Sequence, residues 1–229
     1  MNSQDVRAQL EADWSWRSDE IRFLRNQVSV LTTEDEKDRF RRSLVLMLYA
    51  HLEGFCKMAF AIYVDAINSE GLAIADATEI LGAAAMASVF EALANRDKKN
   101  AVFRTSLPTD EKLHALARRR DFVAQFHEFD RKPLRIEADI VVDTESNLKP
   151  VVLRKLLFVV GLDPSLSAPW EGSLNRLLNS RNGIAHGAER AGIDARAYNE
   201  LEMNVDNIVN GVMGALYQAC RDARHLKCP

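Results

Sequence analysis

The sequence predicts an all-α protein, a single-domain bundle of about six to seven helices in which two long helices form the core. Apolar residues recur at spacings of three and four along most of the chain, and cap residues and glycines mark several helix starts and stops. The 229 residues are 47% hydrophobic and 28% charged, which is the composition of a globular domain. A chain of this length can build a core that needs neither a metal nor a disulfide.

An apolar stripe predicts a first helix that ends near Leu31. Thr33 is placed to cap the next helix, and the three acids after it suit the positive end of the helix dipole. This long second helix ends near residues 68–71, and we expect it to be the backbone of the fold. The two stripes consist of Leu10, Trp14, Ile21, Leu24, Val28 and Leu31, and of Phe40, Leu44, Met47, Leu48, Leu52, Phe55, Ala59 and Ile62.

The middle of the chain predicts two further helices and one extended segment. The alanine-rich residues 77–94 form one helix, and residues 95–106 form a polar connection. Residues 108–111 supply the proline, the cap and the acids of the next helix start, and apolar positions continue to Phe126. The β-branched residues 136–142 predict a short strand or an extended segment.

Three helices are expected in the C-terminal third. Asn147 or Lys149 opens the first, with Pro150 in its first turn and Gly161 as its stop. The second covers residues 171–186, and Gly187 follows as a C-cap candidate. Asp194 can cap the last long helix. Its apolar stripe consists of Leu201, Val205, Ile208, Val212 and Leu216.

Charge and cysteine content narrow the class of protein. The formal net charge is −3 and the pI is near 6, so any nucleic-acid contact must be local. The three cysteines, Cys56, Cys220 and Cys228, contain no C-x-x-C pair, which fits a reducing cytoplasm and predicts no metal site. The N-terminus has no apolar signal region, and charged residues interrupt the apolar stretch 44–67. We therefore expect a buried helix of a soluble protein there, and no membrane partner.

One segment, residues 177–187, combines residue types suited to chemistry. Arg181 offers a fork of donors that matches phosphate oxygens, and His186 can exchange protons near neutral pH. Asn182 can orient a phosphate or a base. On a regular helix Arg181 and His186 lie roughly 140° apart, so one helix does not make them a tight pair. They either converge on a cleft lined by a second helix, or on a phosphate that the long Arg181 side chain reaches from one side, or make ordinary surface contacts. In the first two cases they suit metal-free phosphodiester chemistry.

The apolar second helix carries a second candidate group at residues 49–55. Glu53 either pairs with an arginine, with Arg181 the interesting partner, or points outward as solvated surface. His51 is expected to be a packed or surface histidine, and Gly54 can permit close helix packing. Gly183 reflects either close approach of another chain or ligand or an inconsequential surface position.

Three segments of the chain, taken in sequence order, resemble segments of the HEPN superfamily, the higher eukaryotes and prokaryotes nucleotide-binding domains. Residues 181–186 match its Arg-x4-His motif, with a polar residue directly after the arginine. Residues 49–55, and residues 147–150 with 161–162, resemble a bacterial branch often found near restriction or toxin–antitoxin genes. We expect one HEPN-like domain over residues 1–229, with core similarity over about residues 39–223 and residues 1–35 as a peripheral N-terminal helix.

The resemblance implies a homodimer in which two Arg-x4-His motifs face each other across a cleft. It implies a metal-independent endoribonuclease without a cofactor, acting as a toxin or an antiphage effector, with RNA as substrate and a 2′,3′-cyclic phosphate product. By this carry-over Arg181 and His186 are catalytic, Asn182 assists, and Glu53 occupies the acidic position of the early long helix. A neighbouring antitoxin, such as a nucleotidyltransferase, is an expected partner.

Two alternatives remain open. A non-catalytic HEPN module would bind nucleotide, RNA or a partner protein of a restriction or toxin–antitoxin system, and a purely structural dimer would show only salt-sensitive background binding. No H-E-x-x-H, G-x-S-x-G, P-loop or dinucleotide motif occurs, which argues against a zinc protease, a serine hydrolase and a nucleotide-dependent motor. Basic clusters at residues 39–42, 98–99, 118–120 and 131–132 are either phosphate contacts or solvated faces.

Overall fold

The computed structural model describes residues 2–126 and 128–227, and within these ranges the protein is all-α, as predicted. The described residues form nine α-helices and contain no strand. The α-helices are α1 (Ser3–Asn26), α2 (Glu34–Asn68), α3 (Glu79–Ala85), α4 (Ala87–Ala94), α5 (Glu111–Phe126), α6 (Ala138–Val141), α7 (Pro150–Val159), α8 (Glu171–Ala185) and α9 (Ala195–Arg221). Short 3-10 helices accompany them: η1 (Gln27–Val30), η2 (Ile74–Asp76), η3 (Phe129–Arg131) and η4 (Pro164–Trp170).

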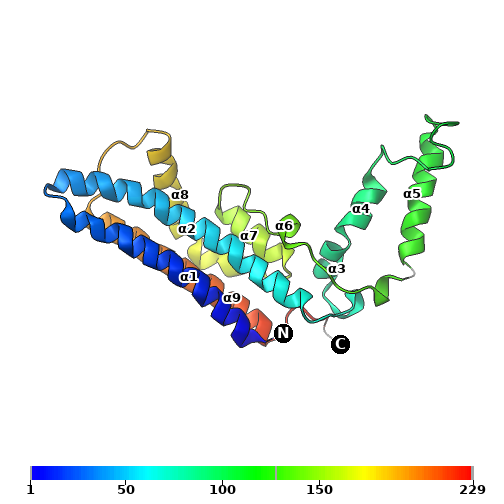
Figure 1. Cartoon of the computed structure of the whole chain (residues 1–229), viewed down its shortest axis with the longest axis horizontal. Helices are drawn as coiled ribbons and strands as arrows, with labels where there is room; N and C mark the ends of the chain where they lie inside the picture. Colours follow the sequence, from blue (N-terminus) through cyan, green and yellow to red (C-terminus); the bar gives the residue numbers. More distant parts are fainter. Residues whose placement is uncertain (1, 127, 228–229) are drawn as a thin grey trace.

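Three long helices, α1, α2 and α9, lie along one another and form the body of the molecule (Figure 1). The predicted stripe of α9 is buried from Leu201 to Leu216, and α2 buries thirteen residues. Residues 1–35 were expected at the periphery, whereas α1 packs along both other helices and buries Val6, Leu10 and Ile21. Side-chain burial on this scale is the main source of stability in a domain of this size.

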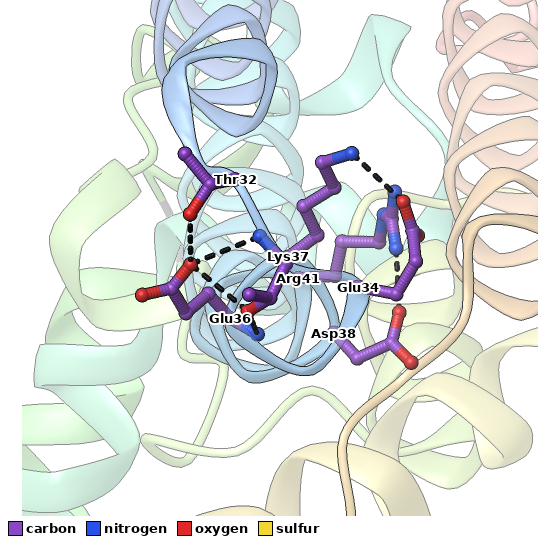
Figure 2. A network of polar contacts seen from close by, with 7 residues as sticks. Thr32, Glu34, Glu36, Lys37, Asp38 and Arg41 are labelled. Carbon is purple, nitrogen blue, oxygen red and sulfur yellow. Dashed lines mark hydrogen bonds and ion pairs between the residues drawn. The ribbon is translucent and has the colours of Figure 1, made fainter.

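The start of α2 follows the predicted capping pattern. The Thr33 hydroxyl accepts a hydrogen bond from the backbone N–H of Glu36 at 3.3 Å, and the Glu36 carboxylate accepts one from the backbone N–H of Thr33 at 3.0 Å. These bonds with Thr33 hold the pKa of Glu36 below its usual value. Figure 2 shows this network together with the adjacent ion pair between Arg41 and Asp38. Reciprocal capping fixes the register in which α2 presents its later residues.

A second group of elements, α7, α8 and η4, lies beside the long helices: α8 packs on α2 and α9, η4 contacts α9, and α7 packs on η4 and α8. Trp170, at the end of η4, lies against Gly211 of α9, where a Cβ atom would sit 2.1 Å from the indole ring. Because no side chain fits there, α9 needs a glycine at this point. Gly161 and Gly187 follow α7 and α8 with φ angles of +78° and +73°, which is the left-handed conformation expected at helix stops.

Helices α4 and α5 stand away from the body as an arm at one end of the molecule (Figure 1). The predicted single helix over residues 77–94 is wrong, because the chain bends at Met86 and divides into α3 and α4. The division has a packing cause: α3 contacts α7 of the body, while α4 contacts α5 of the arm. One straight helix could not serve both partners. This division and the short helix α6 raise the number of α-helices in the described residues above the expected six to seven.

The segment predicted as extended, residues 136–142, is only partly so. Ile136 is paired through its backbone with the Asn68 side chain, which donates to the Ile136 carbonyl and accepts from the Ile136 N–H, both at 2.8 Å. Residues 138–141 instead form the single helical turn α6. A side chain that mimics a strand partner therefore replaces the expected strand.

Within the described residues, α2 is the one helix long and apolar enough to cross a membrane by length and composition alone. Residues in its apolar window are 56% buried within the fold, and core helices of water-soluble proteins pass the same test. Cys56 and Cys220 are free and buried, and Cys228 lies outside the described residues.

Candidate functional site

The site is organised around Arg181, which α8 presents to α2. The Arg181 guanidinium lies over the ring of Tyr49, with 4.8 Å from its central carbon to the ring centroid. A second contact fixes its orientation, because Arg181 donates a hydrogen bond to the Asn182 side-chain oxygen at 2.8 Å. Among the described residues the guanidinium makes no other hydrogen bond, so its remaining N–H groups are available to an anion. Both side chains are half-buried.

Tyr49 is itself held in place by the segment that precedes α7. Its hydroxyl donates to the Asn147 side-chain oxygen at 2.8 Å and accepts from the backbone N–H of Leu148 at 2.6 Å. Burial, together with the nearby negative charge of Glu53, raises the pKa of Tyr49 to about 12. The phenol therefore stays neutral and keeps both bonds at physiological pH. The three segments that carry the HEPN resemblance thus meet at one tyrosine.

Glu53 lies one helical turn after Tyr49 and is half-buried. Its charge acts on Tyr49 and also raises the pKa of the buried Cys56 thiol, although burial is the larger cause there. Among the described residues no ion pair joins Glu53 to Arg181. The structure therefore places Glu53 beside the site through Tyr49 rather than through the arginine.

His186 sits just beyond the last residue of α8, where the helix ends. Its backbone N–H still bonds to the Asn182 carbonyl at 3.0 Å, and its side chain is exposed. Gly187 then turns the chain with a left-handed φ angle. No hydrogen bond joins the side chains of His186 and Arg181 in the described part of the chain, which agrees with the angular separation inferred from the sequence.

The loop after His186 folds back and fixes this helix end. Glu189 returns to α8, where its backbone N–H bonds to the Gly183 carbonyl at 2.8 Å and its side chain lies within 3.1 Å of where a Gly183 Cβ would be. Gly183 is therefore explained by a residue of the same chain rather than by another chain or a ligand. Further along, the Ile193 N–H bonds to the Asp38 carbonyl at 3.0 Å, and the Arg190 carbonyl accepts from Arg42.

His51 points to the other side of α2 and does not join the site. It is buried, its ring packs edge-on to Trp16 at 5.7 Å, and its Nε2 lies 3.6 Å from a carboxylate oxygen of Glu20. Burial lowers the pKa of His51, which favours the neutral ring. Next to it, Gly54 admits the Arg17 side chain of α1. The expectations of a packed His51 and of close packing at Gly54 are confirmed.

The basic clusters divide into paired and unpaired groups. Arg39 pairs with Asp35 and Arg41 with Asp38, and Arg120 pairs with its neighbour Asp121. By contrast, a cavity of about 570 Å³ on the arm brings together four basic side chains. These four residues are Arg96, Lys99, Arg118 and Arg119. Of the run 118–120, two residues thus share one cavity and the third faces elsewhere.

Two residues of the site, Tyr49 and Asn147, received no role from the sequence. Both stood in segments that carry the resemblance, but their contact joins residues 98 positions apart. The available signal was the spacing of four between Tyr49 and Glu53, which puts both on one face of a helix and leaves His51 on another. That spacing does not reveal which distant segment the face meets.

An all-α bundle with an intact Arg-x4-His motif at the end of one helix defines a HEPN-type protein. Over residues 6–224 the chain matches the model of the HEPN_MAE_28990-like HEPN family, and it belongs to this family. The resemblance inferred from the motifs is therefore confirmed, and α1 lies almost entirely within the match. Searches of curated proteins and of solved structures found no significant match. Family membership supports a nuclease or a nucleotide-binding HEPN module.

Among the described residues, no group of three or more His, Cys, Asp or Glu side chains is arranged to hold a metal ion. The ionisable groups gathered at the site are Arg181, Tyr49 and Glu53, with His186 at the helix end. This set contains one fixed cation, one neutral phenol, one carboxylate and one imidazole. It can bind an oxyanion and move a proton.

Proposed function

We propose that the protein is a metal-independent endoribonuclease whose chemistry is carried by Arg181 and His186. The observation that carries the proposal is the placement of Arg181. Its guanidinium is fixed by Tyr49 and Asn182, keeps free N–H groups, and lies in the last turns of α8, the helix that the exposed His186 caps. A preorganised cation combined with an imidazole, which can accept or donate a proton, suits cleavage of a phosphodiester.

In the proposed reaction the RNA supplies its own nucleophile. The 2′-oxygen forms a bond to phosphorus while the bond from phosphorus to the 5′-oxygen breaks. One imidazole accepts the proton of the 2′-hydroxyl, and the 5′-oxygen receives a proton as it leaves. Arg181 stabilises the charge that develops on the phosphoryl oxygens. The products are a 2′,3′-cyclic phosphate and a 5′-hydroxyl.

The reaction needs both a proton acceptor and a proton donor, and α8 provides one imidazole. We propose a homodimer in which the ends of two α8 helices face each other, so that one His186 accepts a proton and His186 of the partner subunit donates one. The exposed position of His186 supports this arrangement, because a side chain on the surface of one chain can reach a second. Asn182 holds Arg181, and Glu53 acts on Tyr49 through its charge.

The experiment that tests this function combines cleavage with analysis of the new ends. Purified protein is incubated with a mixed RNA pool in EDTA, beside the His186→Gln variant at equal concentration. We expect cutting by the wild type, ends that carry 2′,3′-cyclic phosphate and 5′-hydroxyl groups, and loss of cutting in the variant. Intact RNA with the wild type, or equal cutting by both proteins, would overturn the proposal and favour a non-catalytic HEPN module.

We also propose a biological setting, a cytoplasmic toxin or antiphage effector that is restrained by a neighbouring antitoxin such as a nucleotidyltransferase. Such a partner would keep the ribonuclease from cutting the RNA of its own cell. Induction of the wild type should arrest growth, and induction of His186→Gln should not. Equal growth with both proteins at equal expression would contradict the toxin role.

A further inference from the structure

We propose that the arm carries a second RNA-binding site, in the basic cavity between α5 and the loop that precedes it. The inference rests on the proposed ribonuclease function. It says that the arm binds a part of the RNA substrate that is distant from the cleavage site. The cavity, about 570 Å³, is lined by Arg96, Lys99, Arg118 and Arg119. Two acids, Asp97 and Glu111, line it as well, so the four cations outnumber the anions by two.

The arm differs in charge from the rest of the protein. Residues 87–126, from the start of α4 to the end of α5, contain eight Lys and Arg against five Asp and Glu, a net charge of +3, while the whole chain has a net charge of −3. The remainder of the chain is therefore acidic overall. RNA phosphates are negatively charged, so the net positive arm attracts an RNA strand and the net negative remainder of the chain repels it.

Three side-chain hydrogen bonds fix the loop that lines the cavity. His114 is buried beneath it and holds the loop through both ring nitrogens, since Nδ1 accepts from the Asn100 N–H at 3.1 Å and Nε2 lies 3.0 Å from the Leu107 carbonyl. Because Nδ1 accepts, Nε2 is the ring nitrogen that donates to the Leu107 carbonyl. Arg118 adds a third tie, from its guanidinium to the Lys98 carbonyl at 3.1 Å.

Arg118 also leaves a donor unsatisfied. Its Nε atom is buried and has no hydrogen-bond partner among the described residues. An unpaired buried donor on a cation is costly, and a phosphate oxygen entering the cavity is a suitable acceptor for it. Arg119 and Lys99 are exposed, so their charges can reach the same strand from the rim.

The loop also offers a surface for a base. Phe103 lies between Lys99 and Arg104 in the sequence and is 37% exposed. Exposed aromatic rings beside cationic side chains are the usual means by which proteins hold single-stranded nucleic acids without reading their sequence. The arm lies at the opposite end of the molecule from the last turn of α8, so a strand that occupies both places must be long (Figure 1).

The test measures binding without cleavage, in the full-length His186→Ala background. Fluorescence anisotropy of a labelled single-stranded RNA of about 30 nucleotides gives the Kd at several salt concentrations. Lys99→Gln with Arg119→Gln removes two exposed charges of the cavity. Lys112→Gln with Arg120→Gln removes two charges of the same helix outside it and is the matched control. Circular dichroism confirms that both double variants are folded.

We expect the cavity variant to bind RNA about tenfold more weakly. The slope of log K against log salt concentration should become shallower by about 1.4, because each of the two lost phosphate contacts contributes about 0.7 for single strands. The control should bind within about twofold of the parent, since its Arg120 is already paired with Asp121. Phe103→Ala should weaken binding further without changing the salt dependence.

Equal weakening of RNA binding in both double variants, or no weakening in the cavity variant, would overturn the proposal. The basic cavity would then be a candidate binding site for an acidic protein. The outcome is independent of catalysis, because binding is measured with a protein that does not cut. The two proposals can fail separately. If the wild type does not cleave RNA but the cavity variant binds RNA more weakly, the ribonuclease function is contradicted and the binding site on the arm is supported.

Discussion

The body and the arm of this protein differ in how densely their side chains are packed. In the body, α2 buries thirteen residues, and large side chains such as Phe55 and Tyr49 are almost completely removed from solvent. In the arm, α4 buries none of its residues and α5 buries only His114, while Leu116 and Val123 are 63% and 53% exposed. Dense packing gives a rigid scaffold, and sparse packing gives a region of low local stability.

The difference matches what each region is proposed to do. Arg181 must be held to within a fraction of an ångström if it is to stabilise a transition state, and it sits where α8 packs on α2. Binding a flexible RNA strand through its charge needs no such precision. In the arm, a few hydrogen bonds from His114 and Arg118 hold the loop that carries part of the basic cavity. The more demanding of the two proposed roles therefore lies on the body, which is packed more densely than the arm.

The largest effect on stability is expected from the centre of the body. Phe55→Ala removes a fully buried ring that packs edge-on against Trp14 at 5.4 Å, and it should lower the free energy of unfolding by about 3–5 kcal/mol. Leu116→Ala on the arm should change it by less than about 0.5 kcal/mol. Urea unfolding of the two variants measures both values, and similar losses would show that the arm is as tightly packed as the body.

A smaller but sharper test uses two glycines of α9. Gly211→Ala places a Cβ atom against Trp170 and should destabilise the protein by about 2–3 kcal/mol. Gly214 has no atom within 4 Å of an added Cβ, so Gly214→Ala should stabilise the helix by roughly 0.5–1 kcal/mol. Thermal unfolding compares the two, and shifts of the same sign would contradict the packing of Trp170 on α9.

At the site itself, Tyr49→Phe leaves the Leu148 N–H and the Asn147 side-chain oxygen without their partner. We expect a loss of about 1–2 kcal/mol in unfolding free energy and roughly tenfold slower RNA cleavage, because Arg181 loses a fixed platform. Tyr198→Phe is the matched control, since the Tyr198 hydroxyl is buried without a partner among the described residues. A control variant that loses as much as Tyr49→Phe would refute this role.

The smallest expected effect is a change in alkaline stability. The pKa of Tyr49 is raised to about 12 in the folded protein, mainly by burial, while an unfolded tyrosine titrates near 10. A group with a raised folded pKa contributes stability that is complete below pH 10 and is lost as the pH rises toward 12. Urea midpoints between pH 8 and 11 should therefore fall less in Tyr49→Phe than in the wild type. Parallel curves would show that the Tyr49 phenol titrates normally.

Local signals in the sequence predicted much of the body. Thr33 and the acids after it marked the start of α2, and the stripe from Leu201 to Leu216 marked the buried face of α9. Both depend on residues a few positions apart, where helix geometry decides the outcome. The bend at Met86 was not predictable in this way, because it depends on packing against two distant elements.

The site shows the same division. Arg181 and His186 were recognisable from a short motif, and the end of α8 from Gly187, the glycine that follows its C-cap. Tyr49 and Asn147 were not assigned a role, because their contact forms only when α2 meets the segment before α7. Gly183 likewise reflects the return of Glu189, which no spacing within α8 discloses.

The most direct test of the central claim compares two arginines of α8 in an RNA cleavage assay in EDTA. Arg181 lies over Tyr49, whereas Arg176 pairs with Glu200 on the exposed side of the same helix. Arg181→Ala should lower the initial rate by at least about 100-fold, because it removes the cation that stabilises the transition state. Arg176→Ala should leave it within about twofold. Equal rates for the two variants would contradict the assignment of this site as the centre of RNA cleavage.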